Sequence, residues 1–171
     1  MHTRPTLLNS CAKAATAVEA RFRIDAPDPT PQATRIVALD EGAAALIRGV
    51  AKRHWRSAHF LTYEPGTPVP DGDGGSPDLI LRAADGSQVR LSAELAGADM
   101  SVMVATADVG AHAASVIGEA CARRGIMTTG LAFGDDRDVA AAVSALRPHA
   151  RVLLVSKDTD DVPEVLAALR A

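Results

Sequence analysis

Apolar residues first recur at three- and four-residue steps between residues 6 and 24, the spacing that places one apolar stripe on an α-helix. The stripe contains Leu7, Cys11, Val18 and Phe22. Three prolines follow in 25–31, where a helix cannot continue because proline lacks a backbone donor and clashes with the preceding turn. The pattern predicts an amphipathic helix and a stiff linker within 1–33, followed by a single domain over 34–171.

From residue 35 the pattern changes to short apolar runs that alternate with amphipathic stretches, as in a parallel sheet covered by helices. The predicted strands span 36–39, 59–63, 101–105, 126–132 and 151–155. The predicted helices span 43–56, 93–96, 111–124, 137–146 and 162–170. Runs 78–82 and 88–91 flank Asp85-Gly86, a hairpin signal because glycine accepts a positive φ. The predicted fold class is α/β, a three-layer sandwich with a mostly parallel, Rossmann-like sheet and an inserted hairpin.

Composition and charge limit the classes of partner that we expect. Only 3% of the residues are aromatic, whereas stacking on single-stranded nucleic acid needs several exposed rings. The net charge of -3 leaves little basic surface for a phosphate backbone. Residues 1–63 contain nine Lys or Arg and five Asp or Glu, while 64–171 contain nine and sixteen. We therefore expect no nucleic acid, and the charge asymmetry favours a protein partner or a homo-oligomer.

Cysteine usage and hydropathy address compartment and metal binding. Cys11 and Cys121 are the two cysteines, too few for a disulfide framework, and neither belongs to a zinc-type motif. No apolar run reaches the length of a membrane span. The sequence thus predicts a cytoplasmic protein with no metal site and no membrane span.

Two turns carry the candidate chemistry, because ligands of open parallel sheets bind beyond the carboxyl ends of the strands, where strand order reverses. The first turn contains Asp40, Glu41, Gly42 and Ala43. The second contains Asp108, Gly110, Ala111 and His112. Helix N-termini at both turns would favour an anion. The carboxylates, however, would repel a phosphate and can cap the helices themselves.

Three segments resemble the N-terminal nucleotide-binding domain of the tubulin/FtsZ family. The first runs from Arg35-Ile36-Val37-Ala38-Leu39 through the turn at Gly42 to the strand 59–62. The second contains Gly97-Ala98-Asp99-Met100, the strand after it and the helix residues 113–119. The third, 145–158, is similar to the strand that ends near the guanine base. The resemblance implies a bacterial FtsZ-like domain in which GTP or GDP would contact the two turns and Asp158.

The phosphate loops depart from the family pattern. The family's signature loop is a glycine-threonine run whose backbone amides cradle phosphates, whereas 108–114 contains one glycine and no threonine. We therefore expect no GTP hydrolysis and no catalytic residues, in a degenerate domain that acts through protein–protein contacts or self-association. Two alternatives stay open. One is a small-molecule or nucleotide sensor that uses the same crevice, and the other is an enzyme with Asp40, Asp108 and His112 as acid–base groups.

Two acidic runs precede predicted helices. One contains Asp135, Asp136 and Asp138, and the other contains Asp158, Asp160 and Asp161. Carboxylates at a helix N-terminus accept hydrogen bonds from free backbone N–H groups and complement the helix dipole. We therefore expect both runs to cap helices rather than to bind a divalent cation.

Overall fold

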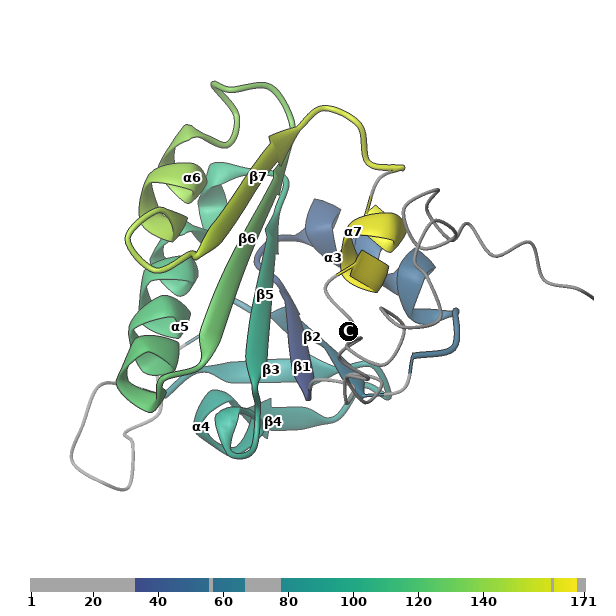
Figure 1. Ribbon diagram of the computed structural model, residues 1–171, viewed down its shortest axis with the longest axis vertical. Coiled ribbons are helices and arrows are strands. Elements are labelled where there is room, and N and C mark those ends of the chain that lie inside the picture. Colours follow the sequence, from purple (N-terminus) through teal and green to yellow (C-terminus); the bar gives the residue numbers. More distant parts are fainter. Residues whose placement is uncertain (1–32, 56, 67–77, 161, 169–171) are drawn as a thin grey trace, which may run out of the picture. The chain divides into compact units, whose positions relative to one another are not determined.

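The structure is a computed structural model that describes residues 33–55, 57–66, 78–160 and 162–168. The amphipathic helix predicted for 6–24 and its linker lie outside the described residues. The described residues form one seven-stranded sheet with the order β4-β3-β2-β1-β5-β6-β7 (Figure 1).

The strands and helices follow one another as predicted. The strands are β1 (Thr34–Ala38), β2 (Ala58–Tyr63), β3 (Ile80–Ala83), β4 (Gln88–Arg90), β5 (Met100–Ala105), β6 (Met127–Phe133) and β7 (Val152–Ser156). The helices are α3 (Glu41–Ala51), α4 (Leu91–Leu95), the 3-10 turn η1 (Asp108–Gly110), α5 (Ala111–Arg124), α6 (Ala140–Leu146) and α7 (Val162–Ala168). Strands β1, β2, β5, β6 and β7 are parallel, and β3 and β4 add an antiparallel hairpin beside β2. The α/β class with a mostly parallel sheet and an inserted hairpin is confirmed.

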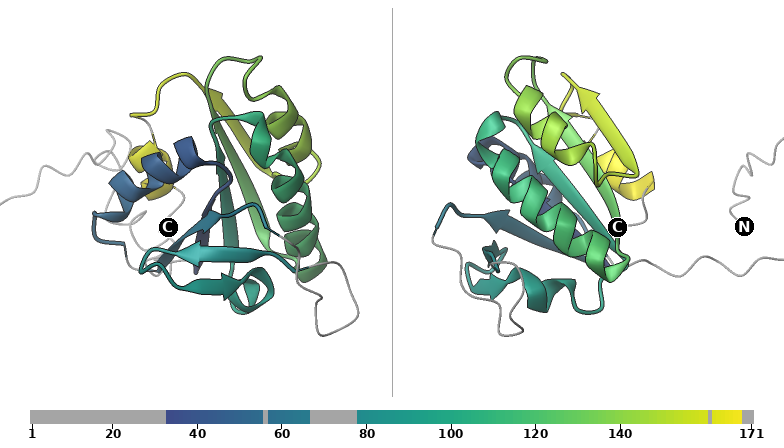
Figure 2. Two further views of the ribbon diagram at one scale, coloured as in Figure 1. Left: turned by 180° about the vertical axis from the view of Figure 1, so that it is seen from behind. Right: turned by 90° about the vertical axis from the view of Figure 1, so that its left-hand side faces the viewer.

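Helices cover both faces of the sheet. α5 and α6 lie on one face, and α3 and α7 lie on the other (Figure 2). Successive side chains of a strand point to opposite faces, so Val37 packs with the α5 and α6 cluster while Ile36 packs with the α3 and α7 cluster. All residues of β1 and β5 are buried, which is typical of central parallel strands covered on both sides.

Helix ends show where local signals decide the structure. α5 has the predicted bounds and ends at Gly125, whose φ of 70° is the left-handed conformation that glycine adopts at little cost. α3 ends five residues before the predicted 56, at Ala51. None of the described helices is long and apolar enough to cross a membrane.

The acidic run before α6 does not cap that helix, so this prediction is wrong. Asp135 and Asp138 instead form a turn in which the Asp138 N–H donates to the Asp135 carbonyl at 2.8 Å. That turn delays the helix to Ala140, and no side chain of the run caps it. A carboxylate from the η1 turn, that of Asp108, accepts the Ala142 N–H at 3.0 Å. The cap therefore comes from a residue 34 positions earlier, which local spacing cannot reveal.

Candidate functional site

The topological switch of the sheet lies between β1 and β5. From β1 the chain adds β2 on one side and later adds β5 on the other, so the carboxyl ends of β1 and β5 are where open α/β sheets bind ligands. The two turns singled out in the sequence lie there. They lie against each other, because Gly110 of the second turn packs on Leu39, the residue directly before the first turn.

The Asp40 carboxylate joins the two turns. Asp40 is 6% exposed and caps α3, because its Oδ1 accepts the Ala43 N–H at 2.8 Å. The same oxygen accepts the Thr106 hydroxyl at 2.5 Å. Oδ2 accepts the backbone N–H groups of Thr106 at 2.7 Å and Ala107 at 3.1 Å. A carboxylate offers about four acceptor positions, so the donors of its own chain fill those of Asp40.

Two glycines allow the turns to close on each other. A Cβ added at Gly110 would lie 2.5 Å from Leu39 Cβ and 2.6 Å from the Leu39 carbonyl oxygen. A Cβ at Gly42 would collide with the Thr106 hydroxyl. In phosphate-binding loops, glycine lets the backbone approach the ligand. Here the space beside each glycine is filled by Leu39 or Thr106.

The remaining predicted site residues do not converge on one cavity. Glu41 is exposed and forms an ion pair with Arg48 at 2.6 Å. Ala43 is buried in the first turn of α3, and Ala111 is half-buried at the start of α5. His112 is exposed, and Asp108 caps α6 as described. Asp158 lies after the outer strand β7, where its Oδ1 accepts the Asp160 N–H at 2.9 Å.

Thr106 is the residue of this site that the sequence analysis did not single out. It follows β5 directly and supplies both a hydroxyl and a backbone N–H to Asp40. The available signal was its position, because residues that follow β1 and β5 end at the same edge of the sheet. A threonine directly after one central strand and an aspartate two residues after its neighbour therefore predict this contact.

An acid–base site is not assembled from the three candidate residues. The carboxylates of Asp40 and Asp108 accept backbone N–H groups of helices α3 and α6, which is a capping role. His112 stands exposed on the first turn of α5. Among the described residues, no group of three His, Cys, Asp or Glu side chains has the arrangement of a metal site.

A hollow is present elsewhere, between α3 and the hairpin side of the sheet. It has a volume of about 210 Å³ and is lined by Ile47, Arg48, Ala51, Lys52, Phe60, Thr62 and Ala84. An adjoining hollow of about 220 Å³ contains Glu64 and Arg82, whose side chains form two hydrogen bonds of 2.6 and 2.8 Å. The guanidinium of Arg82 lowers the pKa of Glu64, and the carboxylate in turn raises the pKa of Arg82. Glu64 and Arg82 therefore pair with each other, and we do not assign them to a ligand site.

Comparison with known proteins gives no family assignment. No protein-family model matches the chain, and no curated protein matches its sequence. The resemblance to the tubulin/FtsZ family stays a prediction, and the functional argument depends on the geometry.

Proposed function

We propose that this chain is a non-hydrolysing, degenerate FtsZ-like domain that acts through association with a partner protein or with copies of itself. In this proposal the crevice at the switch between β1 and β5 no longer receives a nucleotide. The observation that carries it is the Asp40 carboxylate, which binds Ala43, Thr106 and Ala107 across both turns.

The argument concerns the groups that a phosphate would need. Phosphates at helix N-termini bind to free backbone N–H groups. The N–H groups of Ala43, Thr106 and Ala107 already donate to Asp40, which is buried. A nucleotide would have to displace this carboxylate and leave a buried charge without its donors, a cost in free energy that the phosphate contacts would have to offset. The packed glycines Gly42 and Gly110 add a steric barrier.

The outer strand of the sheet supports the second half of the proposal. β7 exposes Val152 and Val155, which are 50% and 41% accessible. Exposed apolar edge strands are surfaces on which other chains add strands. The crevice is filled by residues of the chain itself, whereas the outer edge of β7 is exposed. These two features support association rather than nucleotide binding as the function.

One observation favours the alternative of a small-molecule sensor. The hollow beside α3 combines apolar walls from Ile47 and Phe60 with the cationic side chain of Arg48, the combination that binds a small organic acid. A sensor on this fold would thus use the hollow in place of the crevice.

A thermal-shift series tests the proposal and separates it from the alternative. A ligand at a hundred times its dissociation constant adds about 2.7 kcal/mol to the free energy of unfolding. We expect GTP and GDP, with and without magnesium, to leave the melting temperature unchanged. A saturable shift with GTP that Gly110→Ala abolishes would contradict the proposal. A shift with an organic acid that Arg48→Ala abolishes would favour the sensor.

A further inference from the structure

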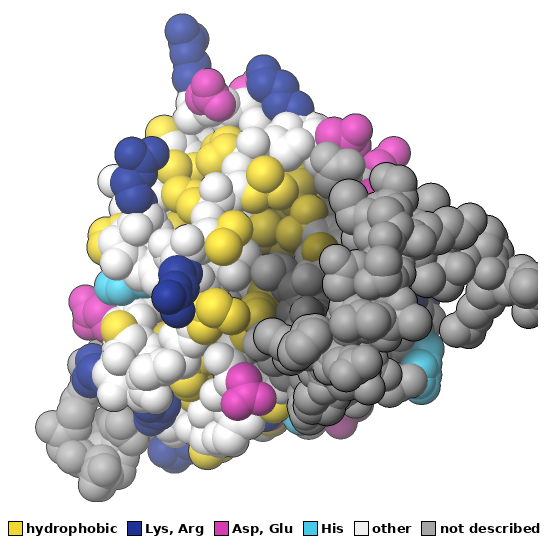
Figure 3. Space-filling view, in the orientation of Figure 1, with side chains coloured by type: hydrophobic (Ala, Val, Ile, Leu, Met, Phe, Trp, Pro, Cys, Tyr) yellow, Lys and Arg dark blue, Asp and Glu magenta, His cyan; other side chains and the backbone are white. Residues whose placement is uncertain are grey.

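The outer edge of β7 combines exposed apolar side chains with a free backbone. Val152 and Val155 are two of the three large hydrophobic side chains that are most exposed among the described residues. Between them Leu153 and Leu154 are half-buried. The space-filling view shows hydrophobic side chains gathered over this side of the sheet (Figure 3). We call the strand Val152–Ser156, with the backbone groups on its outer side, the β7 edge.

The backbone of the β7 edge is available for pairing. The Gly134 N–H, directly after β6, donates to the Ser156 carbonyl at 3.0 Å, so Ser156 directs its backbone toward β6. Because alternate residues of a strand direct their N–H and C=O groups to opposite sides, Val152 and Leu154 also direct theirs toward β6, whereas Leu153 and Val155 direct theirs away from the sheet. No described strand lies beyond β7. The edge therefore presents a donor and acceptor row to an incoming strand.

The opposite edge of the same sheet is protected by comparison. β4 has three residues, Gln88, Val89 and Arg90, and its two flanking side chains are polar and exposed. α4 begins immediately after it at Leu91. Short strands and charged side chains are the devices by which proteins prevent edge pairing. β7 has five residues without a charge among them, so it lacks these devices.

We propose that the β7 edge binds the β7 edge of a second copy of this chain in antiparallel orientation, which joins two seven-stranded sheets across a two-fold axis. This inference rests on the proposed function and names the partner for it. A two-fold axis places the same surface of both copies in contact. Val152 of both copies would then lie on one face of the joined sheet, and Val155 of both copies on the other.

The charges at the two ends of the edge favour the second copy and the antiparallel orientation. Arg151 precedes β7, whereas Asp158 and Asp160 follow it, and all three are exposed. Lys157, also at the latter end, is bound to Asp135, which raises the lysine pKa and lowers that of the aspartate. Antiparallel pairing places the basic end of each copy beside the acidic end of the other. Parallel pairing would place like charges together, which is destabilising.

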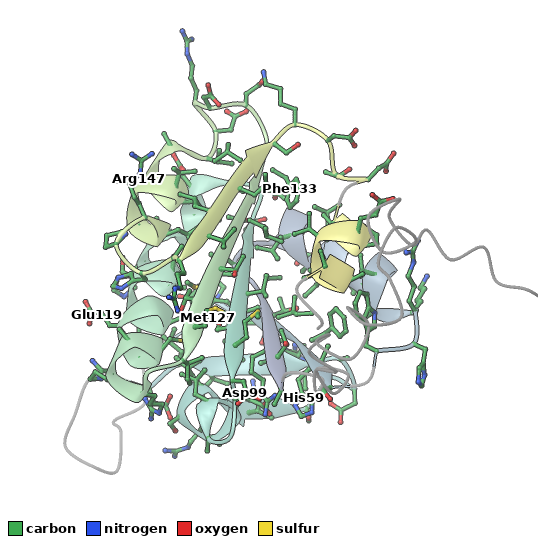
Figure 4. All side chains as sticks on the ribbon, viewed as in Figure 1. His59, Asp99, Glu119, Met127, Phe133 and Arg147 are labelled. Atoms are coloured by element: carbon green, nitrogen blue, oxygen red, sulfur yellow. The ribbon has the colours of Figure 1, made fainter. Side chains whose placement is uncertain are left out.

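The labelled side chains nearest to the edge lie on the two faces of the sheet. Glu119 and Arg147 extend from α5 and α6, on the face of the sheet that those helices cover (Figure 4). Met127 and Phe133, at the two ends of β6, pack in the cluster on the other face. The outermost backbone of the sheet is therefore that of β7, with its own side chains above and below it.

Sedimentation velocity of the full chain tests the proposal. The concentrations should reach about 1 mM, so that a weak dimer is also detected. We expect a monomer–dimer equilibrium for the wild type that Val152→Lys shifts to the monomer at least tenfold. Val109→Lys is the matched control, because Val109 is 70% exposed on η1 and outside the β7 edge. We expect it to dimerise like the wild type. Val155→Pro should also abolish the dimer, because it removes an N–H that faces away from β6.

Charge variants test the orientation. Arg151→Glu should weaken the dimer, and the same chain with Asp158→Lys added should regain it, since each copy then again offers opposite charges at the two ends. If Arg151→Glu dimerises as tightly as the wild type, antiparallel pairing is overturned.

The outcomes separate this inference from the proposed function. A dimer that Val152→Lys and Val109→Lys leave equally strong would overturn the β7 edge as the interface, while association as the function would stand. A wild type that stays monomeric at all concentrations, with slow amide exchange at Leu153 and Val155, would show that another part of its own chain covers the edge and would overturn the second copy as the partner. The proposed closure of the crevice would fail separately, through nucleotide binding.

Discussion

The crevice between β1 and β5 and the outer edge of β7 use the same kinds of groups in opposite ways. In the crevice, the backbone N–H groups of Ala43, Thr106 and Ala107 donate to Asp40, and small residues let the chain pack against itself. At the β7 edge, backbone groups and the apolar side chains of Val152 and Val155 face outward. The crevice, where this fold class usually binds ligands, thus stabilises the folded chain. The outer strand edge, which proteins usually protect, is exposed. Substitutions at the first should change stability, and substitutions at the second should change association.

The largest effect is expected from Asp40→Ala. This variant leaves the N–H groups of Ala43, Thr106 and Ala107 without their acceptor, in addition to removing the α3 cap. We expect a loss of about 3 kcal/mol in the free energy of unfolding, measured by urea denaturation. Glu41→Ala is the control, because Glu41 is exposed and its ion pair with Arg48 lies at the surface; it should change stability by about 0.5 kcal/mol or less. Equal effects of the two variants would contradict the role given to Asp40.

The next effect is expected from Gly110→Ala. Its Cβ would lie 2.6 Å from the backbone oxygen of Leu39, which cannot rotate away as a flexible side chain would. We expect a loss of about 1 to 3 kcal/mol, as for other overpacked sites. Gly49→Ala in α3 is the matched control, since nothing lies within 4 Å of its added Cβ, and it should gain about 0.5 to 1 kcal/mol. If both variants are stabilised in urea denaturation, the crevice is more open than the structure indicates.

A smaller effect on stability is expected at the β7 edge. Val152→Lys keeps the N–H and C=O groups of the strand, and Val152 is half exposed. At concentrations where the chain is monomeric, we expect a change in unfolding free energy within about 1 kcal/mol. Thermal or urea unfolding of the dilute protein measures it. A loss as large as that of Asp40→Ala would mean that Val152 belongs to the core, and the contrast between the two regions would disappear.

The smallest effect is expected from His112→Ala. His112 lies exposed on the first turn of α5, and alanine is the best helix former. We expect unfolding free energy to change by no more than about 0.5 kcal/mol, with dimerisation unchanged. A loss of either property on this substitution would assign His112 a contact that the described residues do not contain.

The sequence predicted the elements of this fold well, because each follows from local periodicity. The helix 111–124 and its end at Gly125 were predicted residue by residue, since an apolar face and a left-handed glycine are both local signals. The α6 cap was predicted wrongly, because it comes from Asp108 across the fold. The antiparallel hairpin followed from Asp85-Gly86, whose Gly86 has a φ of 86°.

The sequence predicted that the two turns lie side by side, but not that the chain's own residues fill the space between them. The sequence places Asp40 and Gly110 at adjacent strand ends because parallel strands end at one edge of the sheet. It does not tell whether a glycine leaves room for a phosphate or for Leu39, since both uses require the absence of a Cβ. The exposure of the β7 edge could not be predicted from the sequence either. Strand order decides whether an apolar strand is central or outermost, and strand order is known only from the structure.

Amide NMR of the wild type with GTP and magnesium tests the closed crevice most directly. The signals to follow are the backbone N–H groups of Ala43, Thr106 and Ala107, which donate to Asp40, together with Gly110. The structure predicts that these signals do not move over the titration and that the three donors exchange slowly with solvent. Saturable shifts of these amides on addition of GTP would contradict the account.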